Sequence, residues 1–346
     1  MTAPTPVRSP LRSAWRRLLP DNFTLALLGT VTLATLLPCR GEVARGFSLL
    51  TDLAIVLLFF LHGAKLSREA ILSGLAHYRL HLLVFASTFV LFPALGLLTG
   101  LLPSSLLGPE LASGFLFLCL LPSTVQSSIA FTSMAGGNVP AAVCSASISN
   151  VLGIFITPVL TGALLGAQGA GVSLGAIRSI LLQLLAPFVL GHLLRPVIGA
   201  FVDRHKSVLS LVDRGSILLV VYTAFSEAVV EGLWQKVSGF DLAVVLAVSG
   251  LILALALAVT TWGARALGFS REDEIAIVFC GSKKSLASGV PMAGVLFPAA
   301  TVGVMIVPLM LFHQIQLMVC AVLARRYAEK PSSEDAERVA REGTPG

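Results

Sequence analysis

The chain has 346 residues, of which 55% are hydrophobic and only 12% are charged, and its formal net charge is +6. Soluble domains carry about a quarter charged residues, so this composition excludes an ordinary soluble protein and indicates a chain embedded in a membrane. Its length leaves no room for a separate soluble domain beside about ten spans.

Ten apolar runs follow one another along the chain, and most of them approach the roughly 20 residues that a helix needs to cross the hydrocarbon core. We expect spans at residues 22–38, 48–64, 81–102, 110–134, 138–167, 175–197, 215–234, 242–264, 273–298 and 301–324. A β-barrel would show short alternating segments instead. The predicted fold class is therefore an all-α polytopic membrane protein with ten transmembrane helices. Residues 1–21 are expected to form a cytoplasmic N-terminal segment and residues 326–346 a disordered cytoplasmic tail.

Basic residues are distributed unevenly between the predicted loops. With loops on alternate sides, 18 of the 24 Lys and Arg residues fall on the side that holds both termini and four on the other, and the remaining two are Lys283 and Lys284. Cytoplasmic loops carry an excess of Lys and Arg. We therefore expect a multi-pass protein of the cell (inner) membrane with both termini in the cytoplasm.

The fourth and ninth predicted spans contain polar interruptions. In the fourth, Pro122 precedes Ser123, Thr124, Gln126, Ser127 and Ser128; in the ninth, Ser282, Lys283, Lys284 and Ser285 lie between Gly281 and Pro291. Each span is the fourth of a half of five, and Pro122 and Gly281 are 159 residues apart, close to the offset of about 153 between the starts of the halves. This predicts two five-helix repeats, 22–167 and 175–325, with opposite orientations because five is odd. Broken helices at matching places in inverted repeats point to the binding site of a transporter.

Ionisable residues within spans are candidates for function because a charge in hydrocarbon is costly. We expect Lys283 and Lys284 to lie at a polar site between half-helices; the alternative is a loop in which both lysines are solvated. Glu227, near the middle of the seventh span, is expected to face the crossing, with a hydrated vestibule as the alternative. Other polar residues within the spans are interpreted as hydrogen-bonding or packing residues: His62, His192, His313, Asn150 and Gln316.

Three stretches resemble the bile acid:sodium symporter (SBF-like) family, and specifically its branch around the seventh member of that solute carrier family. They are LLPSTVQSSIAFTSMAGGNVPAAVCSASISNVLGIFITP from Leu120, VYTAFSEAVVEGLW from Val221 and FCGSKKSLASGVPMAGVLFP from Phe279. The resemblance covers residues 22–325. It implies a panel of spans one, two, six and seven, and a core in which the broken spans four and nine cross.

The sequence departs from the sodium-coupled members of that family. The Ser-Asn pair that helps to hold sodium there falls on Ser127 and Ser128, and the acidic and Gln positions fall on Phe279 and Lys283. An ammonium group repels sodium. We therefore expect that the charge of Lys283 or Lys284 takes the place of the missing cation, so that transport is sodium-free or proton-coupled. A sodium site at Ser127 and Ser128 is the alternative.

Together these features favour a secondary transporter that moves a small organic anion by alternating access. Its binding residues are predicted to be Ser123, Thr124, Gln126, Ser127, Ser128, Glu227, Ser282, Lys283, Lys284 and Ser285. No cofactor, catalytic residue, nucleic acid or metal other than sodium is expected, and the expected partners are the substrate and the lipid bilayer. An intramembrane enzyme would need a catalytic constellation, which the sequence does not offer. A regulatory membrane protein without transport is the alternative. A channel is less favoured, because a continuous pore would need rings of polar residues on several spans.

Overall fold

The computed structural model describes residues 22–65, 77–166 and 181–329, and every regular element within these ranges is a helix. The first half contains α2 (Asn22–Leu36), α3 (Gly41–Lys65), α5 (Tyr78–Ala86), η2 (Ser87–Leu91), α6 (Phe92–Thr99), α7 (Pro109–Leu120), α8 (Gln126–Met134) and α9 (Val139–Leu164). The second half contains η4 (Leu181–Leu185), α11 (Ala186–Arg204), α12 (Lys206–Val230), α13 (Leu233–Lys236), α14 (Gly239–Ala266), α15 (Arg271–Gly281), α16 (Leu286–Leu296), α17 (Ala299–Met305) and α18 (Val307–Glu329). The predicted N-terminal segment and residues 330–346 of the predicted tail lie outside the described residues.

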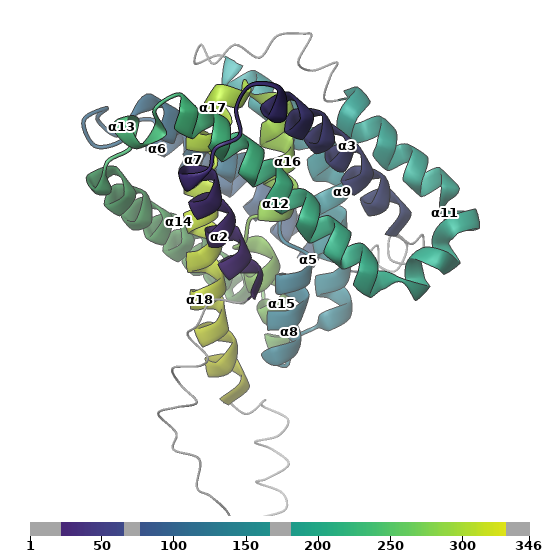
Figure 1. The fold of residues 1–346 in the computed structure, drawn as a ribbon. Helices are drawn as coiled ribbons and strands as arrows, with labels where there is room; N and C mark the ends of the chain where they lie inside the picture. Colours follow the sequence, from purple (N-terminus) through teal and green to yellow (C-terminus); the bar gives the residue numbers. More distant parts are fainter. Residues whose placement is uncertain (1–21, 66–76, 167–180, 330–346) are drawn as a thin grey trace, which may run out of the picture.

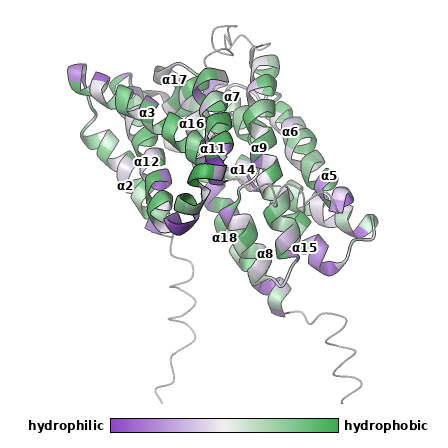
Figure 2. Cartoon of the chain, turned by 90° about the vertical axis from the view of Figure 1, so that its right-hand side faces the viewer, coloured by the Kyte–Doolittle hydropathy of each residue, from purple (hydrophilic) through white to green (hydrophobic). Residues whose placement is uncertain are grey.

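The described helices are predominantly apolar. Seven continuous helical stretches, three of which join neighbouring elements, are long and apolar enough to cross a membrane, and α2 and α7 contain shorter apolar stretches. Figure 2 shows hydrophobic residues along most helix surfaces, whereas many hydrophilic residues gather at the helix ends. The chain is a multi-pass membrane protein.

Several helices begin where the sequence provides a cap for their free N–H groups. Ser238 and Asp241 form a capping box at the start of α14. The Ser270 side chain accepts a hydrogen bond from the backbone N–H of Asp273 at the start of α15, and three acidic residues occupy the first turn of this helix. Asn138 caps α9 in the same way.

The predicted fourth and ninth spans are each broken into two helices. α7 ends at Leu120, and Leu121 is extended (φ −75°, ψ 156°), as expected for a residue before proline. The second break, at residues 282–285, follows Gly281 and contains no proline. Pro291 lies within α16 instead.

The helices form two groups that meet along α12. We call α2, α3, α11 and α12 the panel, because α3 packs on α11 and α12 packs on both α2 and α3. The core comprises α5 to α9 and α14 to α18, and it meets the panel where α16 and α17 pack on α12. Figure 1 shows α2, α3 and α12 in front of other helices, with α11 beside α3 at the right-hand edge. This division agrees with the one implied by the resemblance.

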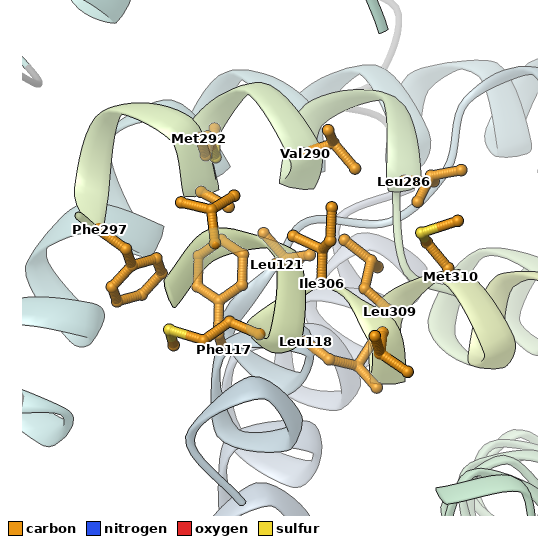
Figure 3. Packing of buried hydrophobic residues seen from close by; sticks show 14 of the residues in the cluster. Phe117, Leu118, Leu121, Leu286, Val290, Met292, Phe297, Ile306, Leu309 and Met310 are labelled. Carbon is orange, nitrogen blue, oxygen red and sulfur yellow. The ribbon is translucent and has the colours of Figure 1, made fainter. Parts of the chain in front are cut away.

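Close packing of α7 on α16 and α18 holds one side of the crossing together. Figure 3 shows Phe117, Leu118 and Leu121 facing Val290 and Leu309. The rings of Phe117 and Phe297 meet edge to face at 5.0 Å and 89°. A side chain at Gly289 would clash with Leu121, since a Cβ there would lie 2.3 Å from Leu121 Cδ1. The two broken helices are thus in direct contact beside their breaks.

Candidate functional site at the helix crossing

The two breaks meet directly in the core. The backbone N–H of Ser285 donates to the carbonyl of Pro122 at 2.9 Å, so the breaks are joined by a main-chain hydrogen bond. Asn150 of α9 connects the same segments, because its Nδ2 donates to Ser123 O at 2.7 Å and its Oδ1 accepts from Ser288 Oγ at 2.8 Å. The sequence interpretation of Asn150 as an interhelical hydrogen-bonding residue is confirmed.

Three carbonyl groups at the end of α7 accept hydrogen bonds from side chains of other segments. Lys284 Nζ donates to Cys119 O at 2.9 Å and to Leu121 O at 2.6 Å. Thr157 Oγ1 donates to Leu120 O at 2.7 Å. Since buried polar groups are costly when unpaired, these bonds allow the helix to end inside the molecule.

The end of α15 is satisfied in a reciprocal way by the first broken helix. Ser128 Oγ donates to Phe279 O at 2.8 Å, and Ser123 Oγ donates to Cys280 O at 2.5 Å. The next carbonyl, that of Gly281, accepts from Ser87 Oγ at 2.7 Å. Each half-helix C-terminus is therefore capped in part by residues of the other broken helix.

Lys283 and Lys284 are both 0% exposed, so the alternative of two solvated lysines is wrong. Lys284 Nζ makes a third hydrogen bond, to Thr88 O at 2.8 Å, and lies 4.2 Å from the centroid of the Phe92 ring. Lys283 Nζ has no hydrogen-bond partner among the described residues and lies 4.4 and 5.3 Å from the ring centroids of Phe131 and Phe279. Both ammonium groups thus lie against aromatic rings, but only that of Lys284 also donates hydrogen bonds to described residues.

A cavity of about 510 Å³ lies between the panel and the core. The starts of α8 and α16 border it through Thr124, Gln126, Ser127, Ser285 and Ser288. The panel lines it with apolar groups and with four ionisable ones: His62, Lys65, Asp213 and Arg214. Helix N-termini carry positive partial charge. The cavity is therefore bordered by two positively polarised helix ends.

Charges at the panel wall are only partly paired. Lys65 forms an ion pair with Asp213. Arg214 lies over the Phe23 ring, with Cζ 5.7 Å from its centroid, and no carboxylate of the described chain pairs with it. This leaves an arginine at the cavity that could bind an acidic group.

The structure divides the predicted binding residues into two sets. Those that line the cavity are Thr124, Gln126, Ser127 and Ser285. Those that do not are Ser123, Ser128, Ser282, Lys283, Lys284 and Glu227. Ser123, Ser128 and Lys284 instead cap half-helices, and Ser282 Oγ donates to Val278 O at 2.6 Å. Glu227 lies in the last turn of α12, ten residues beyond Ile217, which lines the cavity. A binding role for Glu227 stays a prediction.

Sequence reasoning did not assign the panel residues Lys65, Asp213 and Arg214 to the site. Lys65 and Arg214 were counted only as loop charges, because both lie at the ends of predicted spans. Only the packing of α3 against α12 brings them to one cavity. The four-residue cavity group His62, Lys65, Asp213 and Arg214 has no signature in the sequence.

A family model described as the SBF-like CPA transporter family matches residues 21–329. "Uncharacterized protein PA2026" of Pseudomonas aeruginosa is 64% identical over 315 residues, covering 91% of this chain and 95% of the relative. "Putative symporter YfeH" of Escherichia coli is 58% identical over 318 residues, covering 92% and 96%. "Sodium/bile acid cotransporter 7" of Danio rerio is 28% identical over 309 residues, covering 87% and 91%. The resemblance read from the broken-helix motifs is confirmed, and the chain belongs to the SBF-like CPA transporter family.

Proposed function

We propose that this protein is a secondary transporter that moves a small organic anion by alternating access of one cavity. The observation that carries this proposal is the convergence of two half-helix N-termini, those of α8 and α16, on a cavity between panel and core. Discontinuous helices of this kind present backbone N–H groups to anionic substrates at the midplane of transporters. Counting each broken pair as one span is consistent with the expected ten spans, and we propose that these form two inverted repeats.

The lining of the cavity favours an organic rather than an inorganic anion. Leu58, Phe59 and Phe188 provide apolar walls, and Ser127 and Gln126 provide hydrogen-bond donors on the opposite wall. Arg214 can bind a carboxylate or a related acidic group in a bidentate manner. The bile acid in the name of the Danio rerio relative is an organic anion of this general kind, but the cavity does not select that substrate.

The cavity is expected to face the cytoplasm in the conformation described. Lys65, Asp213 and Arg214 lie at the end of α3 and near the start of α12, on the side that the distribution of basic residues assigns to the cytoplasm. Toward the other end of α12, Ala224 and Ala228 contact Gly303 of α17 closely. Such packing holds panel and core together at that end of α12.

Sodium does not fit the crossing well. The carbonyls of Cys119, Leu121 and Thr88 already accept hydrogen bonds from the Lys284 ammonium, and Phe279 stands where sodium-coupled members carry an acid. Sodium prefers oxygen ligands without a neighbouring positive charge. We therefore propose that Lys284 acts as a built-in cation and that transport does not require sodium.

Uptake into proteoliposomes tests this function. A panel of radiolabelled organic anions is offered in sodium and in choline buffers. We expect accumulation of at least one anion, at rates that agree within about twofold between the two buffers. The loss of one charge-assisted contact costs about 1.5–3 kcal/mol. Arg214→Gln should therefore raise the anion concentration that gives half-maximal uptake by about 10- to 100-fold.

Matched controls separate the cavity from the rest of the molecule. Ser133 lies on the same helix as Ser127 but is exposed, and Arg204 lies at the exposed end of α11. Ser133→Ala and Arg204→Gln should leave uptake unchanged, whereas Ser127→Ala should reduce it. Unchanged uptake in Ser127→Ala and Arg214→Gln would favour a protein that acts through contacts with partners. A strict sodium requirement would remove the role given to Lys284 but not the transport function.

A further inference from the structure

His313 of α18 connects the cavity wall to the helix crossing. It lines the cavity and is half-buried, and its Nδ1 lies 2.8 Å from Nε2 of Gln316 one turn later. Gln316 is 0% exposed and lies against the second break. The cavity and the segment that carries both lysines are therefore linked through two side chains of one helix.

The orientation of the Gln316 amide is fixed by the backbone of Lys284. Gln316 Oε1 accepts from Lys284 N at 2.9 Å, and Gln316 Nε2 donates to Lys284 O at 2.9 Å. A flipped amide would place its NH₂ against the backbone N–H and its oxygen against the carbonyl, which loses both bonds. We call this pair of hydrogen bonds the Gln316 clamp.

The clamp selects the tautomer of a neutral His313. An amide NH₂ is only a donor, and its second hydrogen faces His313 Nδ1, so this nitrogen must accept. A neutral imidazole that accepts at Nδ1 carries its proton on Nε2. An imidazolium donates from both nitrogens, so a proton on Nδ1 would bring two donors face to face at 2.8 Å.

The described helices that pack against α18 carry few ionisable side chains. α8, α16 and α17 carry no ionisable side chain, and α7 offers only Glu110 in its first turn and the Cys119 thiol. α18 carries no charged side chain before Arg325, and α14 carries charged side chains only in its first and last turns. The ionisable groups that line the same cavity are His62, Lys65, Asp213 and Arg214, and Gln316 connects His313 to the backbone of Lys284.

We propose that His313 is a proton-binding site through which the cavity controls the geometry of the crossing, with the proton as the coupled cation. Proton binding at Nδ1 and the intact clamp exclude each other, so a proton from the cavity favours conformations in which Gln316 has released Lys284. The Lys284 side chain holds the end of α7, so this release loosens both breaks together. The coupling part of this proposal rests on the proposed transport function, whereas the proton site itself does not.

The tautomer can be observed without any substrate. Histidine labelled with ¹⁵N in nanodisc-embedded protein should give, for His313, a protonated Nε2 and an unprotonated Nδ1 at high pH. The signal is assigned by its loss in His313→Gln and its retention in His205→Gln, in which a histidine outside the cavity, at the end of α11, is replaced. A His313 signal protonated at Nδ1 at high pH overturns the proposal.

Cavity accessibility tests the link to conformation. Ser147→Cys places a reporter thiol in the cavity wall. Its maleimide labelling is measured across pH after the labelling of the unsubstituted protein has been subtracted. We expect a pH-dependent change of at least fivefold that is lost in His313→Gln, whose side-chain oxygen still accepts from Gln316, and kept in His205→Gln. Gln316→Glu should move the transition to higher pH, because a carboxylate accepts from both Lys284 N–H and a protonated imidazole.

These outcomes separate the proton site from the transport function. The proposal is overturned if the pH-dependent accessibility change persists in His313→Gln. It is also overturned if Gln316→Glu does not change the pH at which the transition occurs. If the tautomer and the accessibility change are found but no anion is transported, the proposed function fails while the proton site stands. If uptake is found and its pH dependence is unchanged in His313→Gln, the coupling role fails.

Discussion

Two neighbouring lysines at the crossing should respond in opposite ways to the same substitution. Lys284→Met removes the donor for three carbonyls, those of Thr88, Cys119 and Leu121, and leaves them buried without that partner. We expect a loss of about 2–5 kcal/mol in stability. Lys283→Met removes a buried ammonium that has no hydrogen-bond partner in the described part of the chain, so stability should stay equal or rise. Thermal unfolding of both variants in detergent measures the difference.

Each variant serves as the control for the other, because the side chains are adjacent, identical and equally buried. If Lys283→Met proved as damaging as Lys284→Met, the aromatic surroundings of Lys283 would have to hold an ion or water that supplies its missing bonds.

At the residue scale, the sequence predicted that the lysine pair lies at a polar site between half-helices, but not the role of each member. A charged pair between a glycine and a proline in an apolar run indicates a polar site. The direction of each side chain depends on the path of residues 282–285, which are not helical, and on distant partners such as Thr88. Ser123 and Ser128 were predicted to bind substrate because their distant partners could not be read from the sequence. In the structure their hydroxyl groups donate to carbonyls of α15.

Helix packing in the panel depends on two glycines, and substitution of one of them provides a test. A Cβ at Gly191 of α11 would lie 2.0 Å from Phe60 O, and one at Gly63 of α3 would lie 1.9 Å from Phe188 O. Both neighbours are backbone atoms, which cannot move aside. Gly191→Ala should therefore push α3 and α11 apart and cost about 1–3 kcal/mol. The melting temperature in detergent and the yield of folded protein measure this cost.

Gly250 provides the matched control because it lies inside α14 and has nothing within 4 Å of the added methyl group. Gly250→Ala should be neutral or stabilising by up to about 1 kcal/mol through helix propensity. Equal melting temperatures for the two variants would mean that the helices separate without cost.

At the element scale, the sequence located both breaks, but for reasons of different strength. Pro122 forces the preceding residue out of the helical conformation, so the first break follows from local sterics. Pro291 suggested the second break, yet it lies inside α16, and the chain leaves the helix before Ser285. What ends α15 there is the set of long-range donors Ser87, Ser123 and Ser128, which no local pattern reveals.

At the scale of the whole molecule, hydrophobic runs predicted an all-helical membrane protein, and the motifs predicted its family. The predicted first, fourth and ninth spans correspond to shorter helices, namely α2, α7 with α8, and α15 with α16. Hydropathy alone could not place panel against core, because the cavity residues come from eight separate helices and two breaks. Their convergence is a product of packing.

The proposed alternating access requires the panel and core to separate where α16 packs on α12, so a covalent link there should stop transport. Gly294 of α16 and Val220 of α12 face each other across that contact, and a Cβ on Gly294 would lie 3.7 Å from Val220 Cγ1. Cysteines at both positions come close to disulfide geometry with little movement. We expect oxidation of Gly294→Cys/Val220→Cys to reduce anion uptake to background and a reductant to restore it, while each single variant is insensitive to oxidant. Mass spectrometry reports the cross-link, and unchanged uptake by cross-linked protein would mean that the cavity changes sides without motion between α12 and α16.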